Sequence, residues 1–186
     1  ILYDEIEPYY DKYQKDFGQY EVSGEDDDEK HIQIAIIGRP NAGKSTFINQ
    51  LLKEERLVVG PEAGITRDAI SIDWEFEGRP IRLIDTAGIR RRSNIASELE
   101  KASLMDSFRA LRYAHVAVLM IDATSPLDKQ DLAIASMVIK EGRGIIFVLN
   151  KWDKIKEKTK LLKEVQYQLE KSMPDVKEAP IITTSA

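Results

Sequence analysis

Short apolar runs separated by amphipathic stretches form the main pattern of the chain from residue 31 onward. Three of these runs are strand-sized: Ile32–Ile37, Val116–Ile121 and Gly144–Leu149. Because helices need about ten residues or more, the length of these runs and their content of Ile and Val predict buried strands.

Helices and further strands are predicted between these runs. Helical periodicity is clearest in residues 97–113, and residues 158–172 form a charged amphipathic stretch. Because strands alternate with helices, we expect an α/β fold with a mostly parallel six-stranded sheet and helices on both faces. The predicted helices are Lys44–Leu52, Ser97–Tyr113, Gln130–Lys140 and Lys158–Ser172, and the additional strands are Ala69–Phe76, Ile81–Ile84 and Pro180–Thr184.

The first thirty residues differ from the rest in composition. Residues 1–20 carry apolar side chains at helical spacing, although Pro8 indicates a break or a fresh helix start. Residues 21–30 contain a dense acidic run with almost no apolar side chains, which predicts a linker. We therefore expect a domain boundary here and one domain over residues 31–186.

The bulk composition excludes several classes of protein. The chain has 186 residues, of which 42% are apolar, enough for the core of one domain. A formal net charge of −5 argues against whole-surface attraction to nucleic acid such as DNA, or to anionic membrane. The sequence has no cysteine for a thiolate metal site and no run near the roughly 20 apolar residues of a membrane helix.

The loop after the first predicted strand has the composition of a phosphate-binding loop. Its glycines let backbone N–H groups turn toward phosphate oxygens, and the helix that follows presents its positive dipole end to the same anion. In this pattern Lys44 reaches the β- and γ-phosphates, and the hydroxyl of Ser45 binds Mg²⁺. The residues that match G-x-x-x-x-G-K-[ST] are Gly38, Arg39, Pro40, Asn41, Ala42, Gly43, Lys44 and Ser45.

Two further loops predict contacts to Mg²⁺ and to a γ-phosphate. A D-x-x-G sequence follows the strand Ile81–Ile84 and consists of Asp85, Thr86, Ala87 and Gly88. The carboxylate of Asp85 can hold Mg²⁺ through water, and the N–H of Gly88 can meet the γ-phosphate. Thr66, in the loop before this hairpin, can complete the Mg²⁺ shell when a triphosphate is bound.

A fourth loop predicts selection of guanine. The strand Gly144–Leu149 is followed by an N-K-x-D sequence of Asn150, Lys151, Trp152 and Asp153. The carboxylate of Asp153 can accept both N1–H and N2–H₂ of guanine, a donor pair that adenine lacks. The stem of Lys151 can lie on the base, and Ser185 and Ala186 suit a loop whose backbone N–H meets guanine O6.

Together the four loops resemble those of the translation-factor-like GTPases, and most specifically the second G domain in the Der (EngA) family of bacterial tandem-domain GTPases. The most specific pieces are D-T-A-G-I-R-R-R at 85–92 and N-K-W-D at 150–153. The resemblance covers residues 31–186 and implies a P-loop GTPase G domain. It also implies that residues 1–20 end a preceding G domain, that 21–30 are the interdomain linker, and that a KH-like domain follows.

The resemblance implies a function as well as a fold. It implies a cytoplasmic enzyme that hydrolyses GTP to GDP with Mg²⁺ and acts as a switch in assembly of the large ribosomal subunit. Neither a membrane nor DNA is an implied partner. Thr46 and Ile89 join the implied nucleotide-binding residues, while the implied catalytic residues are Asn41, Lys44, Thr66 and Gly88.

One position departs from the Ras-like mechanism. Those enzymes orient the attacking water with a Gln directly after D-x-x-G, whereas this chain has Ile89, which cannot hydrogen-bond water with its side chain. Asn41 matches the residue that helps hold K⁺ in potassium-activated relatives. We expect K⁺ beside the phosphates to offset developing charge; the alternative is that Asn41 only shapes the turn.

Three alternative functions are open at this point. The first is a regulatory module that binds GDP or GTP with negligible turnover, which Ile89 favours. The second is a related Era-like or tRNA-modification GTPase, which the run Arg90–Arg92 and the acidic linker disfavour. The third is an ATP-using P-loop kinase, which the N-K-x-D loop disfavours.

Overall fold

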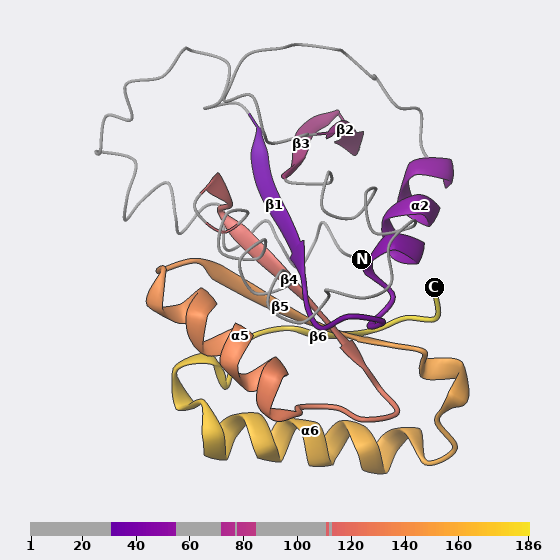
Figure 1. Ribbon diagram of the computed structural model, residues 1–186, viewed down its shortest axis with the longest axis vertical. Helices are drawn as coiled ribbons and strands as arrows, with labels where there is room; N and C mark the ends of the chain where they lie inside the picture. Colours follow the sequence, from indigo (N-terminus) through magenta and orange to yellow (C-terminus); the bar gives the residue numbers. More distant parts are fainter. Residues whose placement is uncertain (1–30, 55–71, 77, 85–110, 112) are drawn as a thin grey trace.

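A computed structural model describes residues 31–54, 72–76, 78–84, 111 and 113–186 (Figure 1). In this part of the chain six strands form one sheet in the order β2-β3-β1-β4-β5-β6. The strands are β1 (Ile32–Ile37), β2 (Ile72–Phe76), β3 (Arg79–Ile84), β4 (Val116–Asp122), β5 (Gly144–Asn150) and β6 (Ile181–Thr183).

The strand pairing is parallel except at one edge. Strand β1 pairs in parallel with β3 and β4, and β4–β5 and β5–β6 are also parallel. The edge strand β2 is antiparallel to β3. Because β1 lies between β3 and β4, the chain runs to one side of β1 and then to the other, which creates the type of crevice where α/β sheets bind ligands.

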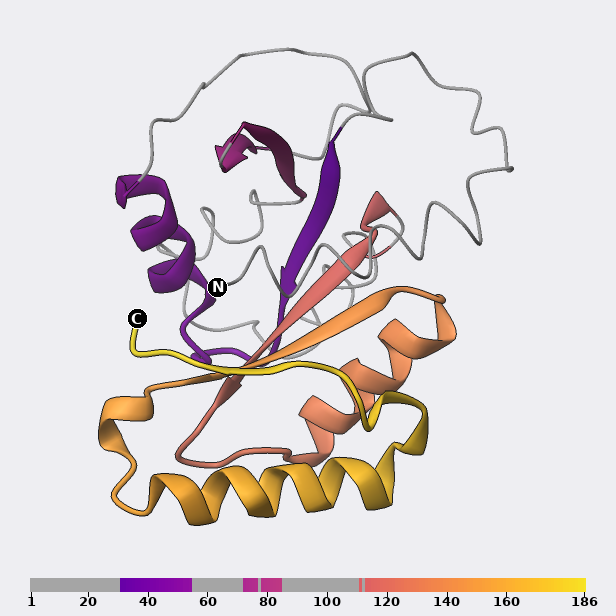
Figure 2. The ribbon, with the colours of Figure 1, turned by 180° about the vertical axis from the view of Figure 1, so that it is seen from behind.

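The described helices cover both faces of the sheet, as the two opposite views show (Figures 1 and 2). One face packs against α2, and the other packs against α5 and α6. The α-helices are α2 (Lys44–Glu54), α5 (Lys129–Lys140) and α6 (Lys158–Ser172), and the 3₁₀ turns are η2 (Trp152–Lys154) and η3 (Pro174–Val176).

Alternate side chains of the central strands supply two separate apolar cores. In β4, Leu119 and Ile121 pack with the α5 and α6 residues, while Val118 and Met120 pack with Ile48 of α2. Successive strand residues point to opposite faces, so a strand covered on both sides must be apolar at every position. This explains why β4 and β5 are continuous apolar runs.

The predicted fold class is confirmed, and most element boundaries agree within two residues. Helix α2 continues to Glu54, which the sequence had placed in a loop, and β6 is shorter than the predicted Pro180–Thr184. Except for Leu111 and Tyr113, the predicted helix Ser97–Tyr113 lies outside the described residues, as do residues 1–30. Within the described ranges, no helix is long and apolar enough to cross a bilayer.

Candidate functional site

The loops that follow β1, β5 and β6 meet at the carboxyl ends of these strands, where the sequence predicts the phosphate-binding loop, the base-reading loop and the segment with Ser185 and Ala186. Residues 38–43 connect β1 to α2, residues 151–153 follow β5, and residues 184–186 follow β6. The sequence placed the phosphate-binding and base-reading residues in these segments, and contacts between the segments join them into one site.

The backbone of the first loop is closely packed at its two glycines. Gly38 and Gly43 have φ values of 140° and 98°, which L side chains rarely adopt. A Cβ at Gly38 would lie 2.3 Å from the carbonyl oxygen of Met120 in β4, and one at Gly43 would lie 2.0 Å from Nδ2 of Asn150. Only glycine therefore allows the loop to pass so close to β4 and to the loop after β5.

Lys44 directs its ammonium group across this loop. Its Nζ donates to the carbonyl oxygens of Gly38 (2.6 Å) and Arg39 (2.5 Å). These acceptors are neutral, and an ionised phosphate oxygen is a stronger partner for an ammonium group. Lys44 is also the first residue of α2, so the positive end of the helix dipole faces the loop. The loop therefore fits a phosphate group.

Asn150 ties the three loops together. This residue is fully buried; its Nδ2 donates to the carbonyl of Ala42 (2.9 Å), and its Oδ1 accepts from the N–H of Ala186 (3.0 Å). The sequence placed Asn150 among the nucleotide-binding residues. Both polar ends of its side chain bond to backbone groups. In this structure Asn150 therefore holds residues 38–43, called the phosphate loop below, against the loops after β5 and β6.

The loop after β5 is also anchored to the loop after β6. Backbone N–H groups of Trp152 and Asp153 donate to the carbonyl of Thr184 (3.0 Å) and to Oγ of Ser185 (3.0 Å). The side chain of Asp153 is exposed. Its carboxylate is thus accessible for a base, while its backbone is fixed.

Lys151 has a carboxylate partner that the sequence analysis missed. It adopts a left-handed conformation (φ 60°), and its Nζ donates to Oδ2 of Asp122 at the end of β4. Thr124 donates to the other oxygen of Asp122 through its N–H (2.9 Å) and hydroxyl (2.6 Å). Burial would raise the pKa of Asp122, but the hydrogen bonds from Lys151 and Thr124 outweigh it and lower the pKa to about 2.

Arg39 is directed to α5, which the motif did not indicate. Its guanidinium donates to Asp131, Asp128 and the carbonyl of Ser125. From the sequence, Arg39 was expected only as part of the nucleotide-binding loop, and neither aspartate was expected at the site. The signal that could have found them is the D-x-x-D spacing of Asp128 and Asp131 at the start of the predicted helix, which is typical of a helix N-terminus.

The predicted metal ligands are only partly described. Ser45 is exposed at the start of α2, whereas Thr66 and Asp85 lie outside the described residues, as do Thr86, Ala87, Gly88 and Ile89. Among the described residues, no group of three or more His, Asp or Glu side chains could hold a metal ion.

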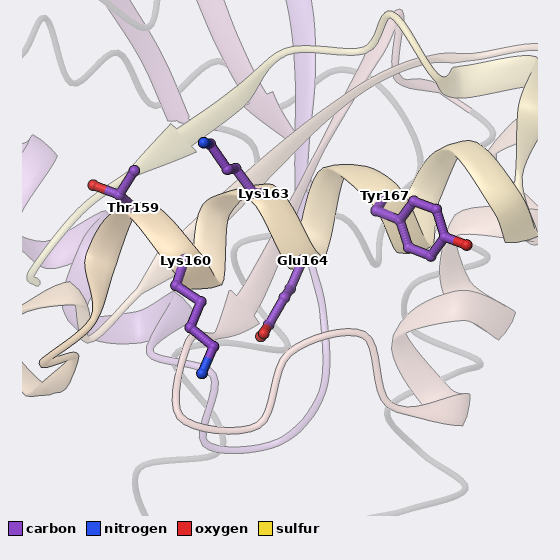
Figure 3. Close-up of a pocket in the computed structure, with 5 residues that line it drawn as sticks. All are labelled: Thr159, Lys160, Lys163, Glu164 and Tyr167. Carbon is purple, nitrogen blue, oxygen red and sulfur yellow. The ribbon is translucent and has the colours of Figure 1, made fainter.

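A shallow hollow on α6 is a separate feature (Figure 3). Its side chains all project from this one helix, and none of them belongs to the loops described above. The lining residues are Thr159, Lys160, Lys163, Glu164 and Tyr167.

The amino-acid sequence matches a known family and well-defined relatives. The family described as 50S ribosome-binding GTPase matches residues 33–151. The GTPase Der of Parvibaculum lavamentivorans is 51% identical over 162 residues, which cover 87% of this chain and 34% of that protein. The GTPase Der of Rickettsia akari is 52% identical over 158 residues, which cover 84% of this chain and 35% of that protein. The chain thus spans about a third of the length of these relatives.

Solved structures show the same fold. Era in complex with MgGDPNP and nucleotides 1506–1542 of 16S ribosomal RNA is 30% identical, with a TM-score of 0.60 over 84% of this chain and 51% of that chain. The elongation factor SelB from Methanococcus maripaludis, bound to the GTP analogue GppNHp, is 19% identical. Its TM-score is 0.59 over 84% of this chain and 30% of that chain, and at this identity it supports the fold alone.

Proposed function

The chain belongs to the 50S ribosome-binding GTPase family, and from this premise we propose that it binds guanine nucleotide with Mg²⁺ and hydrolyses GTP to GDP. The observation that carries the proposal is a pair of hydrogen bonds: the side chain of Asn150 donates to the carbonyl of Ala42 and accepts from the backbone N–H of Ala186. Because these bonds join the phosphate loop to the loops after β5 and β6, one nucleotide can contact all three.

Each end of the nucleotide has a chemically suitable partner in the proposal. The backbone N–H groups of residues 38–43, Lys44 and the α2 N-terminus bind the phosphates. The exposed carboxylate of Asp153 accepts N1–H and N2–H₂ of guanine. Lys151 lies beside it, where Asp122 limits the freedom of its side chain.

Magnesium would be held by residues from three segments. In the proposal Ser45 supplies a hydroxyl from α2, Thr66 a second hydroxyl, and Asp85 a carboxylate through water. When bound, the ion offsets charge on the β- and γ-phosphates. The complex of Era with MgGDPNP, at 30% identity, supports a magnesium nucleotide as the ligand.

Hydrolysis needs a substitute for the water-orienting Gln, because Ile89 stands at that position. We propose that Asn41 helps hold K⁺ beside the phosphates, where it offsets developing negative charge. Asn41 is exposed, has a left-handed φ of 64°, and lies in the turn at residues 40–41 of the phosphate loop. An exposed amide oxygen in that turn suits a weakly bound cation.

The biological role is proposed by homology. Identity of 51–52% to Der proteins, compared with 30% to Era, favours a Der-type G domain over an Era-like one. We propose that it is the second G domain of such a protein and serves as a switch in large-subunit assembly in the cytoplasm. Residues 1–20 would then end a preceding G domain, residues 21–30 would be a linker, and a KH-like domain would follow.

A module that binds nucleotide with negligible turnover is the second candidate, and Ile89 is the observation that favours it. The test is GTP turnover by this chain with Mg²⁺, in potassium chloride and in sodium chloride at equal ionic strength. Turnover that rises in potassium, and loses this rise in Asn41→Ala, is the expected result. Tight GDP binding without turnover in either salt would favour the module.

A further inference from the structure

The guanidinium of Arg39 bridges the phosphate loop to the start of α5. Its Nε donates to Oδ1 of Asp131 (2.8 Å), its Nη1 to Oδ2 of Asp128 (3.1 Å), and its Nη2 to the carbonyl of Ser125 (2.6 Å). These acceptors lie 86 to 92 residues further along the chain. We call Arg39, Ser125, Asp128 and Asp131 the arginine clamp.

Within the clamp, the Arg39–Asp131 pair is desolvated, unlike a surface ion pair. The side chain of Asp131 is 0% exposed and that of Arg39 is 15% exposed. By contrast, the surface pair Lys160–Glu157 has side chains 66% and 72% exposed, and such pairs contribute little. A buried carboxylate that loses its partner is strongly destabilised, so Asp131 needs Arg39.

The second oxygen of Asp131 is also used. It accepts from the backbone N–H of Asp128 (3.1 Å), the residue that precedes α5. One aspartate therefore binds both the first turn of α5 and the phosphate loop. Because α5 packs on the sheet through buried residues such as Ile134 and Val138, the clamp attaches the loop to a rigid element.

The backbone of Arg39, unlike its side chain, contacts Lys44. The backbone carbonyl of Arg39 accepts from Nζ of Lys44 (2.5 Å) and from the N–H of Ala42 (3.4 Å). The residue whose side chain is anchored to α5 thus presents the carbonyl that holds the phosphate-binding ammonium group.

We propose that Arg39 is a positioning residue, which through the arginine clamp holds the first half of the phosphate loop in its binding conformation before nucleotide arrives. The inference rests on the proposed function for its consequence in nucleotide binding. A loop that is already ordered loses less conformational entropy when it binds, so the clamp increases affinity without touching the ligand. The three nitrogen atoms of Arg39 that form the clamp are bound to α5 and to the segment directly before it, so this role differs from direct contact with phosphate.

The test combines two double-mutant cycles in the 186-residue chain. One pairs Arg39→Lys with Asp128→Asn, and the other pairs Arg39→Lys with Asp131→Asn. Lysine keeps the charge but cannot form the three-pronged contact, because its ammonium is a point charge. For each variant we would measure GDP affinity, the KM and kcat of GTP turnover, and backbone hydrogen exchange of residues 38–43 without nucleotide.

The proposal expects Arg39→Lys to weaken GDP binding about tenfold, which corresponds to about 1.4 kcal/mol. KM should rise, whereas kcat should change by no more than about twofold, because the loop binds the ground state and the transition state equally. Exchange at residues 38–43 should accelerate even without nucleotide. The double variants should be little weaker than Arg39→Lys alone, because both changes break one clamp.

The control is Asp73→Asn, which breaks a comparable pair between Asp73 and Arg82 in the β2–β3 hairpin (2.6 Å). It should change neither GDP affinity nor exchange at residues 38–43. If Asp131→Asn fails to fold, the cycle through the half-exposed Asp128 decides the matter, since its loss leaves the core intact.

Two results would overturn the proposal. Additive effects in the cycles would mean that Arg39 acts on the nucleotide directly, and unchanged exchange at residues 38–43 in Arg39→Lys would mean that the clamp does not order the loop. Failure of the wild-type chain to bind GDP would instead overturn the proposed function, while the exchange measurement would still decide whether the clamp exists.

Discussion

At the scale of single residues, the candidate site depends on positions where only one type of residue can make the observed contacts. Gly43 leaves space for Nδ2 of Asn150, and Asn150 in turn uses both ends of its amide on backbone groups. Asp122 is held as a carboxylate by Lys151 and Thr124. A change at any of these positions should act on the site through a specific lost contact.

Gly43→Ala should reduce GDP affinity at least about tenfold, because the new Cβ would lie against Asn150 at a backbone conformation that L residues resist. Titration of labelled GDP checks this. Gly142→Ala is the matched control: its φ is +66°, but no heavy atom lies within 4 Å of its Cβ position. It should cost about 1–2 kcal/mol of unfolding free energy and leave GDP affinity unchanged. Equal losses of GDP affinity in both variants would mean that backbone strain, and not the contact with Asn150, explains the effect of Gly43→Ala.

The low pKa of Asp122 predicts a loss of stability in acid. Its pKa is about 2 in the folded chain and 3.8 for a free aspartate, so the unfolded chain binds the proton more readily. The stabilisation is therefore complete above about pH 4 and is lost as pH falls toward about 2. Because solvent screens this partly exposed pair, we expect about 1 kcal/mol.

Urea unfolding of the wild type and of Asp122→Asn between pH 2 and pH 7 measures this contribution. The difference between the two proteins should shrink as pH falls below about 4. A difference that stays constant over this range would show that the hydrogen bonds do not depend on the charge of Asp122.

At the scale of helices and strands, register determines which side chains meet. Asp122 pairs with Asn150 across β4 and β5, which places the carboxylate of Asp122 next to Lys151. Helix α6 contacts the core through only part of its surface: Val165 and Leu169 are buried, whereas Tyr167 is 64% exposed. The helix should therefore be sensitive to change on one face only.

Leu169→Ala should lower the free energy of unfolding by about 2–5 kcal/mol, because Leu169 is 2% exposed and its removal leaves a cavity. Tyr167→Ala, two residues away on the exposed face, should change it by no more than about 0.5 kcal/mol. Chemical denaturation of both variants provides the comparison. A large loss in Tyr167→Ala would mean that the exposed face of α6 packs against another part of the chain.

At the scale of the whole molecule, the strand order brings distant segments to one edge of the sheet. The phosphate loop lies against β4 at Met120 and against the loop after β5 at Asn150, so ligand binding would connect segments more than a hundred residues apart. A ligand that joins them should stabilise the entire fold.

GDP at a hundred times its dissociation constant should stabilise the chain by about 2.7 kcal/mol, because it binds the folded state alone. For a chain of this size that raises the melting temperature by roughly 5–10 °C. Thermal melts with GDP, with ADP at the same concentration, and without nucleotide test this. ADP should have no effect, and an equal shift with ADP would contradict base recognition by Asp153.

Patterns local in the chain predicted much of this protein. Apolar runs predicted β1, β4 and β5, because a strand buried on both faces must be apolar throughout. The motif at 38–45 predicted the loop between β1 and α2, because all of its phosphate-binding groups, including the glycines and Lys44, occur within eight consecutive residues. Ends of elements were less accurate, as Glu54 shows, because a charged residue fits both a last helical turn and a loop.

Contacts between distant segments needed the tertiary structure. That Asn150 binds the backbone of Ala42, that Asp122 holds Lys151, and that Arg39 reaches Asp131 depends on which strands are neighbours and in which register. A motif states which residue types a site requires, because those requirements are chemical and local. It does not state where a long side chain such as Arg39 points, because the nearest buried charge is supplied by a helix about ninety residues away.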